Sequence, residues 1–223
     1  MNQIYFKRII NKIEYNFVPV YSVKDDSLLG YKIIKDFTPV GFDDKDFMYQ
    51  MAYEEGVFEE LILELLEKAY KIAKEKKYDK YLLFYTLRMN YVSNLKEFFS
   101  NINYIVEHLE MDPTKLIFDI KHITNWYSFY RKIESVYHYK TILKENKGEK
   151  FNLVAIKDSK SMLLEFRVIS HLIALRKEIP ENIKLIFNLG YDDKITIDNL
   201  KKYDIDYYYR YWYINIKKRL LLF

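Results

Sequence analysis

The sequence predicts an α/β fold in which buried strands alternate with helices. Short runs such as residues 81–87 (YLLFYTL) and 115–120 (KLIFDI) are too short and too apolar for surface helices, and they are typical of parallel strands covered on both faces. Longer stretches between them carry apolar residues every three or four positions. The chain has 223 residues, enough for one domain spanning 1–223, whereas a barrel of eight strands and outer helices typically needs about 250. We therefore expect either a barrel short of one βα unit or an open, doubly wound sheet.

The first elements are a helix and two paired strands. Residues 1–14 predict a short helix, because isoleucines recur among basic and polar residues. Residues 17–37 contain two runs of β-branched and aromatic residues joined by a polar KDDS segment, which indicates two strands across a turn. A loop rich in turn formers follows at residues 38–46.

The middle and end of the chain continue the alternation. Residues 58–77 have the clearest helical period, with glutamates early and lysines late, the order that the helix dipole favours. A second helix at 95–109 keeps this period until Asp112 and Pro113 stop it. The other expected helices are 124–137, 162–175, which is very apolar and precedes Pro180, and 195–203; the other expected strands are 151–156, 183–189 and 205–213, with a further strand around 139–143.

Composition argues against several classes of protein. The net charge of +4 comes from 36 basic and 32 acidic side chains, and the basic clusters at 71–77 and 217–219 lack the spacing of a nucleic-acid motif, so no direct nucleic-acid contact is expected. The 5 glycines argue against a glycine-rich phosphate loop. We find no run long enough to span a bilayer and no signal-peptide pattern. The lack of cysteine excludes disulfides and fits a cytoplasmic protein.

Residues 17–37 (FVPVYSVKDDSLLGYKIIKDF) resemble the opening of the bacterial EAL domain, the cyclic-di-GMP phosphodiesterase module, which has a pattern like YQPIVDLKTGEIVGYEALLRW. Pro19, Gly30 and Tyr31 fall where the family has its proline and its glycine-tyrosine pair. Residues 47–58 and 183–216 are similar to the family's FIPLAEETGLI segment and to its closing unit. The resemblance implies a TIM-like (β/α) barrel of the modified EAL type, with an antiparallel opening strand.

The chemistry of that family needs carboxylates and an amide at the C-terminal ends of barrel strands, where they hold two divalent metal ions. Lys32 stands in place of the glutamate that gives the family its name, and an ammonium there would repel a metal ion. By the same resemblance Thr86 replaces a ligating asparagine, Asp119 stands for a glutamate, and His122 takes the place of a later glutamate. Asn188 lies in the turn that carries the family's last glutamate. We therefore expect the metal site to be lost.

The paired aspartates of the family's DDFG motif have two placements. One puts them at Lys157 and Asp158. The other puts them at Lys144 and Glu145, and we prefer it because it keeps the distance to the strand at 183–189 and matches FNLVAIKDS with the family's FDLVKIDRS. Both placements lose metal ligands. The second also replaces family residues by Asn152, Ala155 and Lys157.

The positions that resemble ligand contacts are altered as well. Val18 replaces a glutamine, and Asp36 replaces the arginine that ends the family's EALLR stretch. An arginine–phosphate contact contributes about 1.5–3 kcal/mol, and an anion in its place would repel the phosphate. Binding of cyclic-di-GMP in the usual pose is therefore not expected.

These substitutions predict a degenerate, catalytically inactive EAL-like protein with no catalytic, cofactor-binding or metal-binding residues and no cofactor. We expect it to regulate by binding another protein, such as a transcription regulator, and a homodimer is an open expectation. One alternative is a receptor that binds cyclic-di-GMP or a related nucleotide without hydrolysis. Another is a rebuilt metal-dependent phosphodiesterase, in which four carboxylates would have to converge: Asp119, Asp158, Asp192 and Asp193.

Overall fold

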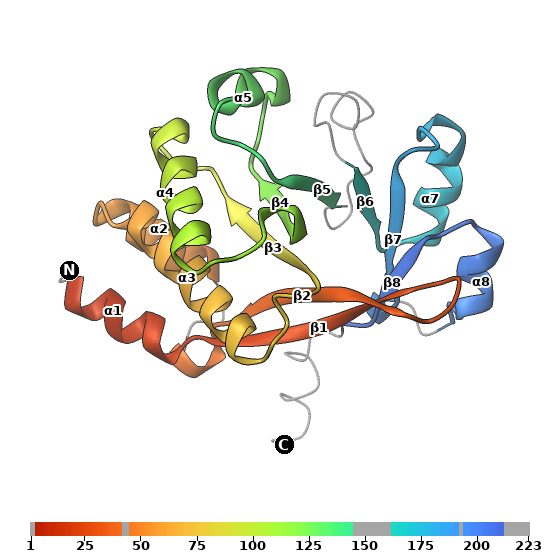
Figure 1. The fold of residues 1–223 in the computed structure, drawn as a ribbon, viewed down its shortest axis with the longest axis horizontal. Coiled ribbons are helices and arrows are strands. Elements are labelled where there is room, and N and C mark those ends of the chain that lie inside the picture. Colours follow the sequence, from red (N-terminus) through yellow and green to blue (C-terminus); the bar gives the residue numbers. More distant parts are fainter. Residues whose placement is uncertain (1–2, 42–44, 145–161, 192–193, 212–223) are drawn as a thin grey trace. The chain divides into compact units, whose positions relative to one another are not determined.

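A computed structural model describes residues 3–41, 45–144, 162–191 and 194–211 (Figure 1). Eight strands follow one another from β1 to β8 in the order of a closed barrel. The predicted α/β barrel is therefore confirmed, and the expectations of a missing strand or an open sheet are wrong. The chain divides into two compact units. The first unit consists of Met1–Phe17 and Gly30–Thr141, and the second unit consists of Val18–Leu29 and Ile142–Phe223. That the whole chain forms a single domain stays a prediction.

The first unit contains most of the helices. Strands β2, β3 and β4 run parallel, with Lys32 opposite Phe84 and Thr86 opposite Asp119. The elements of this unit are α1 (Gln3–Lys12), the start of β1 (Glu14–Ser22), most of β2 (Leu28–Asp36), η1 (Thr38–Val40), α2 (Lys45–Glu54), α3 (Phe58–Glu75), β3 (Leu82–Arg88), α4 (Leu95–His108), η2 (Pro113–Lys115), β4 (Leu116–Lys121) and α5 (Trp126–Ile133). The predicted helices at 1–14, 58–77, 95–109 and 124–137 are confirmed, the last in shortened form. Helix α2 was not predicted from the sequence.

Helix α3 is at the centre of this unit and packs against α1, α2 and α4 (Figure 1). Its apolar stripe is fully buried, because residues three and four apart share one helix face. The ring of Tyr70 on α3 lies 6.0 Å from the ring of Tyr85 on β3. Successive side chains of a strand point to opposite faces, so Phe84 and Thr86 face away from the helices, toward the barrel interior.

The second unit carries the antiparallel opening strand that the resemblance implied. β1 pairs antiparallel with β8, with Tyr21 opposite Tyr208, whereas β5, β6, β7 and β8 are parallel neighbours. Thr196 begins α8 with a capping box. This unit contains the end of β1, the start of β2 and, from Ile142 on, β5 (Lys140–Lys144). Its other elements are β6 (Leu163–Phe166), α7 (Ile169–Leu175), η3 (Arg176–Glu178), β7 (Lys184–Asn188), η4 (Leu189–Tyr191), α8 (Ile197–Lys202) and β8 (Tyr207–Tyr209).

The predicted helix at 162–175 is wrong in its first part, because Leu163–Phe166 forms β6 and only Ile169–Leu175 is helical. All four residues of β6 are buried, and a short run that is apolar on both faces cannot be assigned to strand or helix by its period alone. The predicted strand at 151–156 lies outside the described residues. The match of residues 151–159 to the family's FDLVKIDRS segment likewise lies outside the described residues.

The predicted strands at 81–87, 115–120, 139–143 and 183–189 are confirmed as β3, β4, β5 and β7. The strand expected at 205–213 is observed only as Tyr207–Tyr209, and residues 212–213, like the apolar chain end, lie outside the described part. Every helix that the structure describes is too short or too polar to cross a membrane.

Candidate functional site

Four residues from neighbouring strands of the first unit share the interior face of the sheet. Phe84 and Thr86 point away from the helices, as described above. Lys32 lies opposite Phe84, and Asp119 lies opposite Thr86. Aligned residues of adjacent strands have their side chains on the same face. The structure therefore brings together three of the predicted site positions, Lys32, Thr86 and Asp119, toward the carboxyl ends of β2, β3 and β4.

Asp119 is buried, with 3% of its surface exposed, and both of its carboxylate oxygens have partners. Thr86 Oγ1 donates a hydrogen bond to Oδ2 at 3.1 Å, and Lys121 Nζ lies 3.2 Å from Oδ1. Burying a carboxylate is costly unless it is paired and hydrogen-bonded, and here the chain's own hydroxyl and ammonium supply both. Among the described residues, no three His, Cys, Asp or Glu side chains come together in a way that could hold a metal ion. A metal ion at Asp119 would have to displace Lys121.

Lys32 is also buried, with 6% of its surface exposed. Its ammonium therefore adds positive charge to the face that carries Asp119. Lys35 lies three residues further along and on the other face of β2. Its Nζ donates to the Thr86 carbonyl oxygen at 3.1 Å and lies 4.1 Å from the centre of the Tyr85 ring. Lys35 thus joins β2 to β3 through a backbone hydrogen bond and a cation–π contact.

His122 follows the end of β4 in the left-handed backbone region, with φ of 65°. Burial lowers its pKa, and the charges of Arg88 and Lys121 lower it further, whereas Asp46 acts in the opposite direction. Arg88 forms an ion pair with Asp46, and its guanidinium lies 4.6 Å from the centre of the Tyr49 ring. The position predicted for a later glutamate is thus taken by an imidazole whose charged form is disfavoured by burial and by nearby cations, a poor environment for another positive ion.

The second unit has its own buried charged group, which was not predicted from the sequence. Glu165 on β6 has no exposed surface. Its Oε1 lies 3.1 Å from Lys144 Nζ and accepts a hydrogen bond from the Tyr209 hydroxyl at 2.7 Å. Lys144 ends β5 opposite Glu165, so register alone sets this ion pair. The only signal in the sequence was one acidic residue inside an apolar run, and the helix predicted there concealed it.

Asn188 at the end of β7 has a structural use. Its Oδ1 accepts hydrogen bonds from the backbone N–H groups of Gly190 at 2.9 Å and Tyr211 at 3.2 Å. A Cβ atom at Gly190 would lie 1.9 Å from the Tyr211 carbonyl oxygen, so the backbone here requires glycine. The turn that resembles the family's last glutamate segment is therefore closed by an amide oxygen bound to the chain itself.

The remaining predicted site residues have ordinary surroundings or lie outside the described part. Asp36 Oδ1 accepts from the backbone N–H of Thr38 at 2.9 Å, which closes a turn, and Val18 is half-buried on β1. The convergence of four carboxylates around Asp119 is not tested, because only Asp119 is described. The positions outside the described residues are Glu145, Asn152, Ala155, Lys157, Asp158, Asp192 and Asp193.

No protein-family model and no curated protein sequence matches this chain. Solved structures do match its fold. The EAL domain of FimX from Pseudomonas aeruginosa, bound to c-di-GMP, has a TM-score of 0.67 at 15% identity, and the match covers 94% of this chain and 93% of that one. An EAL domain protein from Listeria monocytogenes EGD-e has a TM-score of 0.64 at 12% identity, and the match covers 100% of this chain and 99% of that one.

The Bacillus subtilis YkuI protein, which has an EAL domain and was solved in complex with c-di-GMP and calcium, has a TM-score of 0.68 at 13% identity. That match covers 96% of this chain and 58% of YkuI. At these identities the similarity establishes the fold alone. The chain therefore has the scaffold of an EAL domain, as the resemblance implied.

Proposed function

We propose that this protein uses an EAL-type scaffold without hydrolysing cyclic-di-GMP, and that it acts by binding another protein in the cytoplasm, such as a transcription regulator. The observation that carries the proposal is the Asp119 site. By resemblance to the family, Asp119 is the one acidic residue kept at the strand ends of the first unit. Its carboxylate is paired with Lys121, so it is not left open to a metal cation.

Electrostatics supports the loss of metal chemistry. A divalent ion that activates water needs several oxygen ligands, usually carboxylates, around one open position. On the interior face of β2, β3 and β4, Asp119 contacts the Thr86 hydroxyl and the Lys121 ammonium, and Lys32 lies two register positions earlier on β2. Adding a doubly charged ion to this face would place it against ammonium groups.

Exposed aromatic side chains on the helices of the first unit support a protein-binding role. Phe47 is 56% exposed, Tyr53 52%, Tyr104 68% and Tyr127 70%. Aromatic rings are the side chains that most often carry binding energy at protein interfaces. They give this unit several apolar contact points on α2, α4 and α5.

Hydrolysis is the direct test. Purified protein incubated with cyclic-di-GMP and Mg²⁺ or Mn²⁺ is expected to leave the nucleotide intact when the mixture is separated by chromatography. An active EAL phosphodiesterase in the same buffer serves as the positive control and must yield the linear dinucleotide. Formation of that product by this protein, in proportion to its concentration, would overturn the proposal.

A nucleotide receptor is the second candidate, and one observation favours it. Lys32 and Lys121 share the interior face of β2, β3 and β4, and cations are the groups that hold phosphates. Calorimetry with cyclic-di-GMP in the presence of a chelator separates the two candidates. Saturable micromolar binding would favour the receptor, and absence of heat would favour the protein-binding role.

A further inference from the structure

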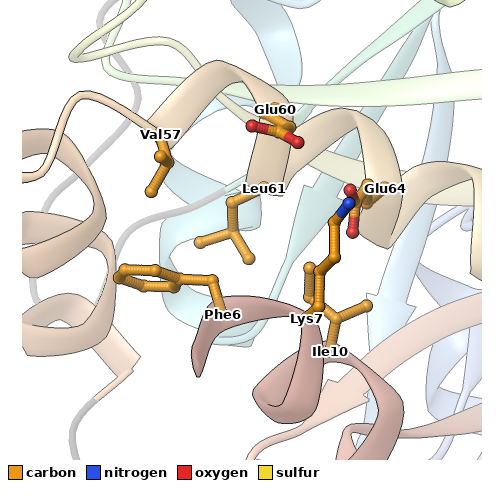
Figure 2. A pocket seen from close by; sticks show the side chains of 7 residues that line it. All are labelled: Phe6, Lys7, Ile10, Val57, Glu60, Leu61 and Glu64. Carbon is orange, nitrogen blue, oxygen red and sulfur yellow. The ribbon is translucent and has the colours of Figure 1, made fainter. Parts of the chain in front are cut away.

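The two ends of α3 differ in charge. At its start, Glu60 and Glu64 line the same hollow as Lys7 of α1, so acidic and basic side chains meet there (Figure 2). At its end, residues 71–80 (KIAKEKKYDK) contain five lysines, one glutamate and one aspartate. Three of these lysines follow the end of α3 and are exposed: Lys76, Lys77 and Lys80. The end of α3 therefore leads into a basic surface.

Four aromatic rings lie together beside these lysines. The ring of Tyr78 is stacked on the ring of Tyr31 with centroids 3.9 Å apart, and it lies 5.4 Å from the ring of Phe17. Tyr81 meets Tyr31 edge-on, with centroids 5.7 Å apart. Lys77 has φ of 58°, and this turn in the chain takes Tyr78 back toward β1 and β2. All four rings are half-buried, so they form a fixed base for the lysines around them.

The rings hold two of the lysines, and the positive charges are open. Lys76 Nζ lies 5.4 Å from the centre of the Phe17 ring, and Lys80 Nζ lies 5.5 Å from the centre of the Tyr81 ring. Within the described part of the chain, Lys76, Lys77 and Lys80 form no ion pair, whereas the two earlier lysines of this stretch each have an acidic partner. Ammonium groups that rings already hold lose less conformational freedom when an anion binds.

An acidic segment of a protein fits this surface better than a nucleic acid or a lipid bilayer does. A nucleic-acid base needs a free ring face, but these rings are stacked on one another or lie under ammonium groups. Glu75 and Asp79 stand among the lysines, and a regular row of phosphates would meet them. Half-buried rings also leave little apolar surface to insert into a bilayer.

The three lysines and the four rings are here called the Tyr78 surface. We propose that the Tyr78 surface binds an acidic segment of the protein partner. Carboxylates of that segment pair with the ammonium groups of Lys76, Lys77 and Lys80, and an apolar side chain packs on the exposed edges of the rings. The inference rests on the proposed protein-binding function and adds the chemistry of the partner.

The probe is a short fluorescein-labelled peptide of glutamate, leucine and tyrosine, and its counterpart has lysine in place of glutamate. Fluorescence anisotropy gives the affinity, and amide chemical shifts of the ¹⁵N-labelled protein locate the contact. The acidic peptide is expected to bind more weakly as NaCl is added, and to shift the amides of Phe17, Tyr31 and residues 76–81. Absence of binding, equal binding of the lysine peptide, or shifts without a focus on these residues would refute the proposal.

Two other anionic probes check the class of partner. A single-stranded oligothymidine and vesicles of phosphatidylserine with phosphatidylcholine are each titrated at the same NaCl concentration. Both are expected to bind more weakly than the acidic peptide. Tighter binding of either probe at residues 76–81 would overturn the assignment to a protein segment.

The sequence supplies a matched control, because KKYD occurs at residues 76–79 and again at 201–204. Lys201 and Lys202 end α8 and are exposed. Lys76→Gln with Lys77→Gln is expected to weaken binding of the acidic peptide at least about fivefold, whereas Lys201→Gln with Lys202→Gln should change it less than about twofold. Equal losses would mean that the peptide responds to total charge, and the Tyr78 surface would be refuted.

Lys77→Gly separates binding from stability. Lys77 lies in the left-handed backbone region, which glycine adopts without a steric penalty. The variant is therefore expected to unfold at the same or a higher temperature while it binds the acidic peptide more weakly. If it binds the peptide as tightly as the unmodified protein does, Lys77 makes no contact and the proposal is contradicted.

The outcome is separable from that of the proposed function. If the hydrolysis assay yields the linear dinucleotide, the proposed function fails whatever the peptide does. If the nucleotide stays intact and the acidic peptide does not bind at the Tyr78 surface, only the docking proposal fails.

Discussion

A buried carboxylate can keep its charge without a metal ion when the chain supplies both a hydrogen-bond donor and a cation. Asp119 has Thr86 and Lys121 in these roles, and in the other unit Glu165 has Tyr209 and Lys144. Each pair offsets a desolvation penalty of several kcal/mol per ion. At the scale of residues, these acidic side chains therefore stabilise the fold in their present pairs and are poorly placed to bind a further cation.

Asp119→Asn is expected to destabilise the protein by about 1–3 kcal/mol, since the amide is neutral and leaves Lys121 without its carboxylate. Chemical denaturation measures this loss. Adding Lys121→Met should recover part of it, because the second change removes the cation left without a partner. If the two changes were simply additive, Asp119 and Lys121 would not be coupled.

At the scale of elements, α3 holds its neighbours by capping their ends. Lys68 Nζ donates to three backbone carbonyls at and just after the end of α1, those of Ile10 at 2.7 Å, Asn11 at 3.0 Å and Ile13 at 2.8 Å. Lys74 donates in the same way to the carbonyl at the end of α4, at 2.6 Å. The last carbonyl groups of a helix lack hydrogen-bond donors within the helix and lie at the negative end of its dipole. An ammonium group there donates hydrogen bonds to these carbonyls and also interacts favourably with the dipole.

Lys68→Met should release the end of α1 while keeping most of the apolar stem. We expect a loss of about 1–3 kcal/mol in unfolding free energy and faster hydrogen exchange in residues 9–13. Lys71→Met is the matched control, because Lys71 is exposed and forms a surface ion pair with Glu67, so its loss should stay below about 1 kcal/mol. Equal effects of the two variants would argue against the capping role.

The pairing of β2 with β3 depends on a glycine. Gly30 lies opposite Leu82, and a Cβ atom at Gly30 would lie 2.1 Å from the Leu82 carbonyl oxygen. Gly30→Ala is therefore expected to cost more than about 3 kcal/mol or to prevent folding, as thermal unfolding would measure. Gly41→Ala is the control: Gly41 has φ of 77° and open space around it, so only about 1–2 kcal/mol of backbone strain is expected. A mild effect at Gly30 would mean that the two strands can separate without loss of the fold.

At the scale of the whole molecule, a scaffold built to hold metal ions would gain stability from them, because a ligand that binds only the folded state raises the unfolding free energy. Here Lys121 already neutralises Asp119. We therefore expect the midpoint of thermal unfolding to be the same in a chelator and in millimolar Mg²⁺ or Mn²⁺. A rise of several degrees that saturates with metal would show a site and contradict the proposed function.

The sequence by itself determined most of the elements, because the period of apolar residues directly reports which faces are buried. It predicted α3, α4, β3, β4 and β7, and its resemblance to the EAL family placed Lys32 and Asp119 on barrel strands. It failed at β6, since four residues buried on every side carry no period. That failure also concealed Glu165.

Only the tertiary structure decided which charges meet. Asp119 and Lys121 are two residues apart, but Thr86 reaches Asp119 from 33 residues away, and Tyr209 reaches Glu165 from 44 residues away. Which partner a side chain meets depends on the register between neighbouring strands. That register exists only in the assembled sheet, in which segments far apart in the sequence lie side by side. A local pattern can report that a side chain is buried, whereas the identity of its partner is determined by the pairing of strands.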